Sequence, residues 1–170
     1  MTTSRSGVRV ELAGEGSASI ATGLPVLDHL VGALAGHARL RVALEVAPGG
    51  PDEEVVAAGR AFGAAVGELL TADGATGRGW AIVPADEALA SAALERAETP
   101  RFVSNVDFSD ERVAGLATDV ASKFLEEMAA AAGLNLHVRL VEGRDPQHVL
   151  AAMFKAVGAA LGQACRKEQA

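Results

Sequence analysis

Hydrophobic positions along this chain follow two different periods, and the changes between them mark the expected elements. Apolar residues at every second position predict strands over Val8–Leu12, Ser17–Ala21, Arg39–Val46, Trp80–Val83, Arg101–Val106 and Leu134–Val141. Apolar residues three and four positions apart predict helices over Val26–His37, Asp52–Leu70, Asp119–Ala132 and Gln147–Arg166. The stretch Asp86–Leu94 fits either period and stays ambiguous.

Turn and cap signals divide these elements. The Ala13–Gly16 stretch is typical of a turn, so Ser17–Ala21 is expected to be the return strand of a hairpin. The Pro48–Asp52 stretch breaks the chain before a helix. Asp52 is expected to cap that helix, with Glu53 and Glu54 in its first turn, where negative charge suits the helix dipole.

The order of elements contains an internal repeat. Residues 30–70 and 124–164 both follow the pattern helix, glycine, strand, Gly/Pro/Asp turn and alanine-rich helix. A unit of that size covers its own sheet poorly, so two copies are expected to pack together. The sequence therefore predicts an α+β two-layer sandwich made of two similar halves. We expect one domain over 1–170, with half-repeats at about 8–95 and 96–170.

Composition excludes several classes of function. The net charge of -7 argues against nucleic acid as a partner, because phosphate backbones need a basic face. Aromatic residues make up 4% of the 170 residues, which disfavours base stacking. The single cysteine, Cys165, forms neither an internal disulfide nor a thiolate metal cluster. The sequence shows neither a long apolar run nor a signal-like start, so we expect a cytoplasmic protein that does not bind membranes.

The histidines and carboxylates are the candidates for chemistry. His29 and His37 stand eight positions apart in the first helix, so both fit one side of it. Each fits a surface or structural position as well, and His137 in an alternating strand fits a structural one. His148, in the first turn of the last helix, is the better candidate for a ligand. The Asp86-Glu87 pair fits either acid–base chemistry or a solvated turn.

A set of short motifs, spread over most of the chain, occurs in a characteristic order and spacing. Its members are Thr22-Gly23 with Leu27-Asp28-His29, His37, Pro84-x-Asp86-Glu87-Ala88-Leu89, Leu136-His137-Val138-Arg139, Gly143, His148 and Phe154-Lys155-Ala156. Together they resemble the imidazoleglycerol-phosphate dehydratase family, a lyase family of histidine biosynthesis. The resemblance implies a duplicated fold of the ribosomal protein S5 domain 2-like type. It also implies homo-oligomers, built from trimers into a 24-subunit shell, with two manganese ions per site at subunit contacts.

The reaction implied by the resemblance removes water from a phosphorylated imidazole diol, with an imidazolate held between the two metals. This chain departs from the family at most metal-ligand positions. One implied site falls on Asp52, Lys123, Gln147 and Ala151, and the other falls on His29, Glu53, Val56 and His148. The first set is unsuited to manganese. The second leaves His29, Glu53 and His148 as the expected ligands of one divalent ion, if any cofactor binds.

The resemblance also implies contacts with a small phosphorylated ligand. Lys155 occupies the position of a substrate lysine, and His37 matches a family histidine. Arg78 and Arg101 lie near the positions of two family arginines, although not in register with them. These four residues are therefore the expected substrate-binding residues.

The resulting hypothesis is a divergent family member that has lost dehydratase activity and serves as a non-catalytic subunit or a binding protein. A first alternative is a functioning or altered dehydratase that uses a single ion. A second is a structural partner of an intact family member. Because metal helps to join trimers in the family, we expect a smaller homo-oligomer here, such as a trimer.

Overall fold

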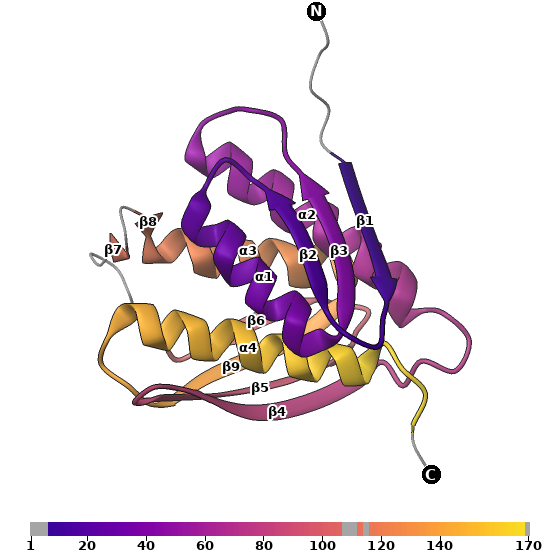
Figure 1. Cartoon of the computed structure of the whole chain (residues 1–170). Coiled ribbons are helices and arrows are strands. Elements are labelled where there is room, and N and C mark those ends of the chain that lie inside the picture. The colour runs from indigo at the N-terminus through magenta and orange to yellow at the C-terminus, as the bar shows by residue number, and fades with distance from the viewer. Residues whose placement is uncertain (1–6, 107–111, 114–115, 169–170) are drawn as a thin grey trace, which may run out of the picture.

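The computed structural model describes residues 7–106, 112–113 and 116–168. Figure 1 shows one sheet on each outer side of the molecule and the long helices between the sheets. The first half contains, in chain order, β1 (Gly7–Leu12), β2 (Ser17–Ala21), α1 (Pro25–Ala38), β3 (Leu40–Glu45) and α2 (Pro51–Leu70). The second contains β4 (Arg78–Ala85), β5 (Ala88–Arg96), β6 (Arg101–Ser104), β7 (Arg112–Val113), β8 (Leu116–Ala117), α3 (Thr118–Ala132), β9 (Leu134–Glu142) and α4 (Pro146–Ala164).

The two larger sheets share one topology. The first has the order β1-β3-β2, with β3 antiparallel to β1 and parallel to β2. The second has the order β4-β5-β9-β6, with β9 antiparallel to β5 and parallel to β6. The predicted α+β fold made of two similar halves is therefore confirmed. By sheet membership residues 78–96 belong with the second half, whereas the sequence placed the division near residue 95.

The structure corrects two local predictions and resolves a third. Ser17–Ala21 is a strand, but the predicted hairpin is wrong, because β1 and β2 both pair with β3. The helix expected to be capped by Asp52 has Gly50 as its N-cap, because Pro51 takes the first helical position. The ambiguous stretch Asp86–Leu94 begins with a turn at Asp86 and Glu87 and continues as β5, whose buried alanines alternate with more exposed residues.

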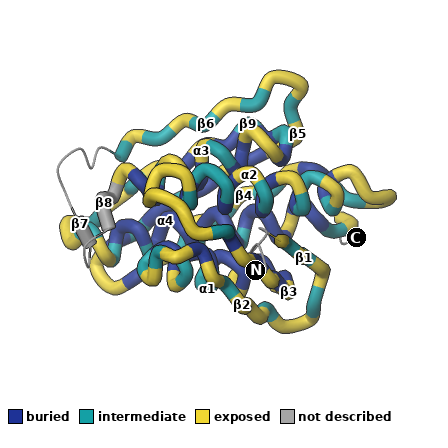
Figure 2. Tube along the Cα trace, turned by 90° about the horizontal axis from the view of Figure 1, so that it is seen from above, coloured by how far each residue is buried: buried dark blue, intermediate teal, exposed yellow. Residues whose placement is uncertain are grey.

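The alternation that predicted the strands corresponds to one buried face per strand. In β3, Leu40, Val42 and Leu44 are buried, while Arg41 and Glu45 are exposed. The helices bury their apolar sides in the middle of the molecule, and exposed positions follow the loops and outer turns (Figure 2). Stacked rings cross this core: Phe124 lies 6.0 Å from Phe62 and 5.9 Å from Phe154 between ring centres. No helix of the described residues is long and apolar enough to cross a membrane.

Glycines bring the helices together in two parallel pairs. A Cβ atom at Gly158 of α4 would collide with the carbonyl oxygen of Leu34 in α1. Four residues further along both helices, a Cβ at Gly162 would lie 2.6 Å from the oxygen of Ala38. Between α2 and α3, Gly63 lies against Met128, and four residues further along both helices Gly67 lies against Ala132. The N-terminal ends of each pair therefore lie at one end, and the C-terminal ends at the other.

Replacement of Gly158 by alanine tests this contact. We expect Gly158→Ala to lower the free energy of unfolding by about 1–3 kcal/mol, because the new methyl group overpacks a backbone contact. Gly36→Ala in α1 is the matched control, since nothing lies within 4 Å of a Cβ there. Its better helix propensity should leave stability unchanged or raise it by up to about 1 kcal/mol. Equal urea unfolding curves for the two variants would contradict the close packing.

Candidate functional site

The N-terminal ends of α1 and α4 enclose a cavity of about 720 Å³ together with the turn between β4 and β5. We call this the α1/α4 pocket. Its wall is mostly proline, valine, leucine and alanine side chains. Its polar members are His29, Asp86, Gln147, His148 and Lys155. An apolar wall with a few convergent polar groups is the usual composition of a small-molecule site.

A buried turn fixes the start of α1 at this pocket. The backbone N–H and hydroxyl of Thr22 both donate to Oδ1 of Asp28, at 2.9 and 2.5 Å. Thr22 is fully buried. The Thr-Gly and Leu-Asp-His motifs of the sequence are thus parts of one local structure. It leaves the adjacent His29 exposed at the mouth of the cavity.

His148 is held by two carboxylates of its own chain. Its Nδ1 lies 2.5 Å from Oε2 of Glu87, and its Nε2 lies 3.3 Å from Oδ2 of Asp86. Nδ1 is hydrogen-bonded to Glu87 and Nε2 lies within ion-pair distance of Asp86, which favours the positively charged imidazolium. We call Asp86, Glu87 and His148 the histidine clasp.

The β4–β5 turn also ties the clasp to the loop before α4. Oε1 of Glu87 accepts hydrogen bonds from the backbone N–H of Asp145 at 3.0 Å and of Arg144 at 3.4 Å. The pKa of Glu87 is lowered to about 2, mainly by the hydrogen bond from the backbone of Asp145 and next by the hydrogen bond with His148. In return, the hydrogen bond to Glu87 raises the pKa of His148 above its usual value. Both shifts favour the charged pair.

The second parallel helix pair forms a smaller cavity at the N-terminal ends of α2 and α3. This α2/α3 pocket has a volume of about 360 Å³, and its lining includes Asp52, Val56 and Lys123. Nζ of Lys123 lies 3.3 Å from Oε1 of Glu127 and 3.6 Å from Oε2 of Glu126. The hydrogen bond to Glu127 contributes most to the raised pKa of Lys123. A paired ammonium thus stands where the resemblance implied a metal ligand.

The structure brings only some of the predicted site residues together. His29, His148 and Lys155 line the α1/α4 pocket. Glu53 is exposed in the first turn of α2, outside the residues described as lining either pocket. Both sets of metal ligands implied by the resemblance are divided between the two pockets. In the first set, Gln147 and Ala151 line the α1/α4 pocket, whereas Asp52 and Lys123 line the α2/α3 pocket. In the second set, His29 and His148 line the α1/α4 pocket, whereas Val56 lines the α2/α3 pocket.

The remaining predicted substrate residues lie elsewhere. Arg78 begins β4 and lines a third cavity near the end of α4. Arg101 is exposed at the start of β6. His37 is exposed near the end of α1, with its Nδ1 3.1 Å from the carbonyl oxygen of Ala33 in the same helix. These three positions are separate from the lining of the α1/α4 pocket in the described structure.

Known proteins resemble this chain in both sequence and fold. The family model described as imidazoleglycerol-phosphate dehydratase matches residues 22–161. The chain belongs to the imidazoleglycerol-phosphate dehydratase family. An imidazoleglycerol-phosphate dehydratase of Desulfitobacterium hafniense is 36% identical over 94% of this chain and 84% of its own length. One from Metallosphaera sedula is 32% identical over 93% of this chain and 84% of its own length.

Solved imidazoleglycerol-phosphate dehydratase structures support the fold. The Staphylococcus aureus structure superposes with a TM-score of 0.87 at 24% identity, covering 96% of this chain and 95% of its own. The Pyrococcus furiosus structure gives a TM-score of 0.83 at 24% identity, covering 99% of this chain and 94% of its own. The predicted family and the duplicated fold are thus both confirmed.

The manganese ions that characterise the family do not fit the residues at these positions. Both nitrogens of His148 are engaged by carboxylates, and Lys123 adds a positive charge to the α2/α3 pocket. Within the described residues of one chain, no group of three histidine, cysteine or acidic side chains is placed to hold a metal.

Titration of His148 tests the clasp. We expect its pKa, followed by NMR of the ring protons, to fall in Glu87→Gln, because the carboxylate that favours the imidazolium is lost. His148 stabilises the folded state below its ordinary pKa of 6.5, and this effect is lost as pH rises through its raised pKa. The stabilisation of the folded state by Glu87 is present above pH 4.5, its ordinary pKa, and is lost as the pH falls towards about 2.

The stability cost of Glu87→Gln should therefore be largest between about pH 4.5 and 6.5 and smaller at alkaline pH. Glu98→Gln changes the same charge at an exposed loop position and serves as the control. An unchanged pKa of His148 in Glu87→Gln would show that the clasp does not form in solution.

Proposed function

We propose that this family member keeps a ligand pocket but does not carry out metal-dependent dehydration. It binds a small phosphorylated ligand, as a binding protein or a non-catalytic subunit of a homo-oligomer. The observation that carries the proposal is the histidine clasp, in which both nitrogens of His148 face carboxylates of the same chain. A cytoplasmic location agrees with a family of biosynthetic enzymes.

Charge makes the loss of metal chemistry reasonable. In the α1/α4 pocket, the imidazolium of His148 is already paired with both Asp86 and Glu87. In the α2/α3 pocket, the ammonium of Lys123 is already paired with Glu126 and Glu127 of α3. A divalent ion would have to break the first pair and approach the second cation closely, which is electrostatically unfavourable. Protein cations thus take the place of metal charge in both pockets.

The α1/α4 pocket nevertheless suits an anionic ligand. Two parallel helices direct their N-terminal ends, and the positive ends of their dipoles, towards it. Lys155 adds an ammonium group, and the exposed ring of His29 adds a hydrogen-bonding group. The apolar wall can contact a ring. A phosphorylated imidazole compound combines these features, and the family's name makes imidazoleglycerol phosphate the first ligand to test.

The alternative of a single-ion enzyme is less well supported. It needs His29, Glu53 and His148 as ligands of one ion. Glu53 lies outside the described lining of the pocket, and His148 would first have to leave the clasp. The alternative therefore requires His148 to leave the clasp, and a neighbouring chain to supply Glu53, since the resemblance implies metal sites at subunit contacts.

An assay with imidazoleglycerol phosphate separates these functions. With added Mn(II), we expect the purified protein to show no turnover above buffer under conditions where the Desulfitobacterium hafniense relative is active. Calorimetry should still detect ligand binding, and Lys155→Ala should weaken it about tenfold, through loss of a phosphate contact. Arg60→Ala, at an exposed ion pair on α2, should bind like the wild type.

Turnover that disappears in His148→Ala would contradict the proposal and support the single-ion enzyme. Absence of both turnover and ligand binding would contradict the binding function. In a further arm, the protein is mixed with the active relative. Co-assembly of the two proteins without ligand binding by this chain alone would favour a structural partner.

A further inference from the structure

The two larger sheets of this duplicated fold differ by one strand. In the second sheet, β5 is antiparallel to β9 on one side and pairs with β4 on the other. In the first sheet, β1 takes the place of β5, because it is antiparallel to β3. The other side of β1 has no strand partner among the described residues, and β1 stands at the outer edge of its sheet (Figure 1). The first sheet therefore lacks a counterpart of β4.

The same difference leaves part of a helix uncovered. α4 packs against β4 and β5, and its Ala156 and Ala160 are fully buried. Counted from the proline that begins each helix, Ala61 and Ala65 of α2 are the counterparts of these alanines. They are only partly buried, and Ala64 between them is exposed. Because α2 also packs against β1, a strand added beside β1 would lie over these alanines, as β4 lies over those of α4.

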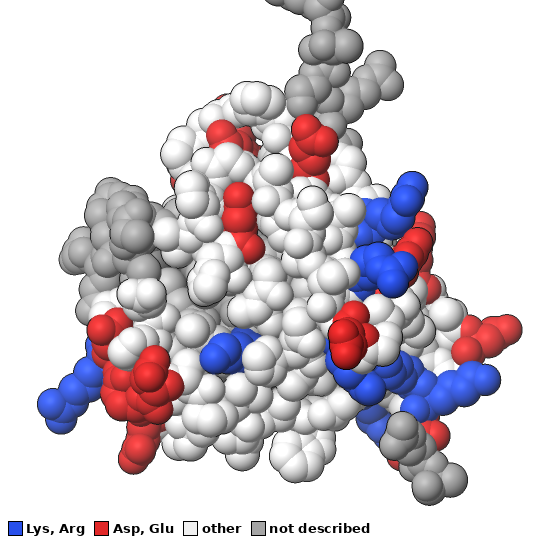
Figure 3. Space-filling view, in the orientation of Figure 1, with Lys and Arg blue, Asp and Glu red and all other residues white. Residues whose placement is uncertain are grey.

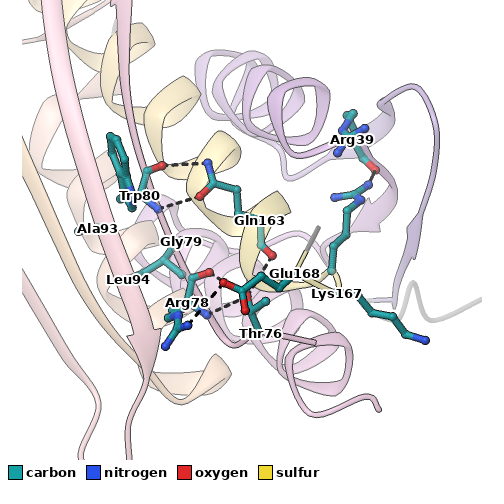
Figure 4. Close-up of a pocket in the computed structure, with 11 residues that line it drawn as sticks. Arg39, Thr76, Arg78, Gly79, Trp80, Ala93, Leu94, Gln163, Lys167 and Glu168 are labelled. Carbon is teal, nitrogen blue, oxygen red and sulfur yellow. Dashed lines mark hydrogen bonds and ion pairs between the residues drawn. The ribbon is translucent and has the colours of Figure 1, made fainter. Parts of the chain in front are cut away.

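The outer edge of β4 is closed, whereas that of β1 is open. The side-chain amide of Gln163 accepts from the N–H of Trp80 at 3.1 Å and donates to its carbonyl oxygen at 2.9 Å (Figure 4). Pro84 in the same strand has no N–H to offer. β1 contains no proline, and its register with β3 has no bulge. Proteins usually protect edge strands with such devices, because free backbone groups recruit another strand.

The pairing with β3 determines which backbone groups of β1 are free. Directly beyond the ladder, the N–H of Ala13 donates to the carbonyl oxygen of Arg39 at 3.0 Å. Hydrogen-bonded and non-hydrogen-bonded pairs alternate along antiparallel strands, so every second residue counted back from Ala13 bonds to β3. The residues between them direct their N–H and C=O groups to the open edge. They are Val8, Val10 and Leu12.

Charge selects how a second copy of β1 fits this edge. Arg9 forms no ion pair among the described residues, and Glu11 has an exposed one with Arg41. When two β1 strands run antiparallel with Val10 opposite Val10, Arg9 of each copy lies opposite Glu11 of the other. A shift by two residues in either direction places like charges opposite each other, which is unfavourable. Figure 3 shows basic and acidic side chains next to each other on the side of the molecule where β1 runs.

We propose that two copies of this chain associate through the open edge of β1, antiparallel and about a two-fold axis at Val10. The backbones of Val8, Val10 and Leu12 supply the hydrogen bonds, as in other cases of strand addition. The Arg9–Glu11 pairs fix the register. Leu12 is 47% exposed in the single chain and lies next to Val8 of the second copy.

The product is one continuous sheet in the order β2-β3-β1-β1-β3-β2. Such a contact uses the same patch on both chains, so it joins chains in pairs. If trimers form through another face, this contact joins two of them, and the number of chains is even in either case. The contact does not involve the α1/α4 pocket, so it stands independently of the ligand proposed for that pocket.

Cysteines at the two charged positions test the register. In the proposed pairing, positions 9 and 11 of different copies form a non-hydrogen-bonded pair with Cα atoms about 4.5 Å apart, within reach of a disulfide. We expect co-expressed Arg9→Cys and Glu11→Cys chains to form a covalent dimer with diamide as the oxidant. Each variant alone should give much less, because equal positions are diagonal to each other. The native Cys165 is buried and is present in every sample.

The mass in solution, from light scattering, tests the contact without a cross-link. The wild type should contain an even number of chains, and Arg9→Glu should halve its mass, because like charges then face each other. Arg9→Glu combined with Glu11→Arg restores opposite charges and should recover most of the wild-type mass. Arg139→Glu makes the same charge change at an exposed position of β9, in the other sheet, and should keep the wild-type mass.

Three outcomes would overturn the proposal. The first is a wild-type mass of one chain or of an odd number of chains. The second is an unchanged mass in Arg9→Glu while circular dichroism shows it to be folded. The third is a yield of covalent dimer from the co-expressed cysteine variants no higher than that from either variant alone.

Discussion

Backbone contact at glycines, between two parallel pairs of helices, determines where the cavities of this protein lie. Gly158 and Gly162 hold α4 against α1, and Gly63 holds α2 against α3. A larger residue would separate each pair and its sheets. Because each pair is parallel, like ends meet, and the space between those ends and the nearest strand or turn becomes a pocket. The duplicated topology produces this arrangement twice.

Parallel helices also concentrate charge. The N-terminal ends together attract negative groups, and the C-terminal ends attract positive ones. Asp52, Glu53 and Glu54 stand in the first turn of α2, and Arg166 binds the last carbonyl oxygens of α1 and α4. At the α1/α4 pocket, Asp86 and Glu87 bring their negative charge to His148. In the proposed function, protein cations supply the charge that manganese contributes in the family.

The sequence predicted the features that depend on local pattern. Alternation and helical spacing located the long elements, and the repeat over 30–70 and 124–164 indicated the duplicated fold. Strand partners could not be predicted in this way. The pairing of β2 with β3 rather than with β1 joins segments on either side of a helix, and a period of two carries no information about partners. Asp52 failed as a cap because Pro51 fixed the helix start two residues earlier than such a cap requires.

The site was predictable only where a motif carried it. His29, His148 and Lys155 were identified through the resemblance, and the structure places them around one cavity. The clasp was missed because Glu87 and His148 are 61 positions apart and meet only when the β4–β5 turn reaches α4. The separation of Glu53 from His29 and His148 could not be predicted from the sequence either, because it depends on how the α1/α4 and α2/α3 pairs are placed in the fold.

The most direct test of the central claim is the metal content of the purified protein, measured by elemental analysis after incubation with excess Mn(II) and desalting. If protein cations have replaced the metal charge, the manganese content should be close to zero per chain. One or more tightly held ions per chain, lost in His29→Ala, would contradict the account. That result would mean that the clasp opens to admit a metal.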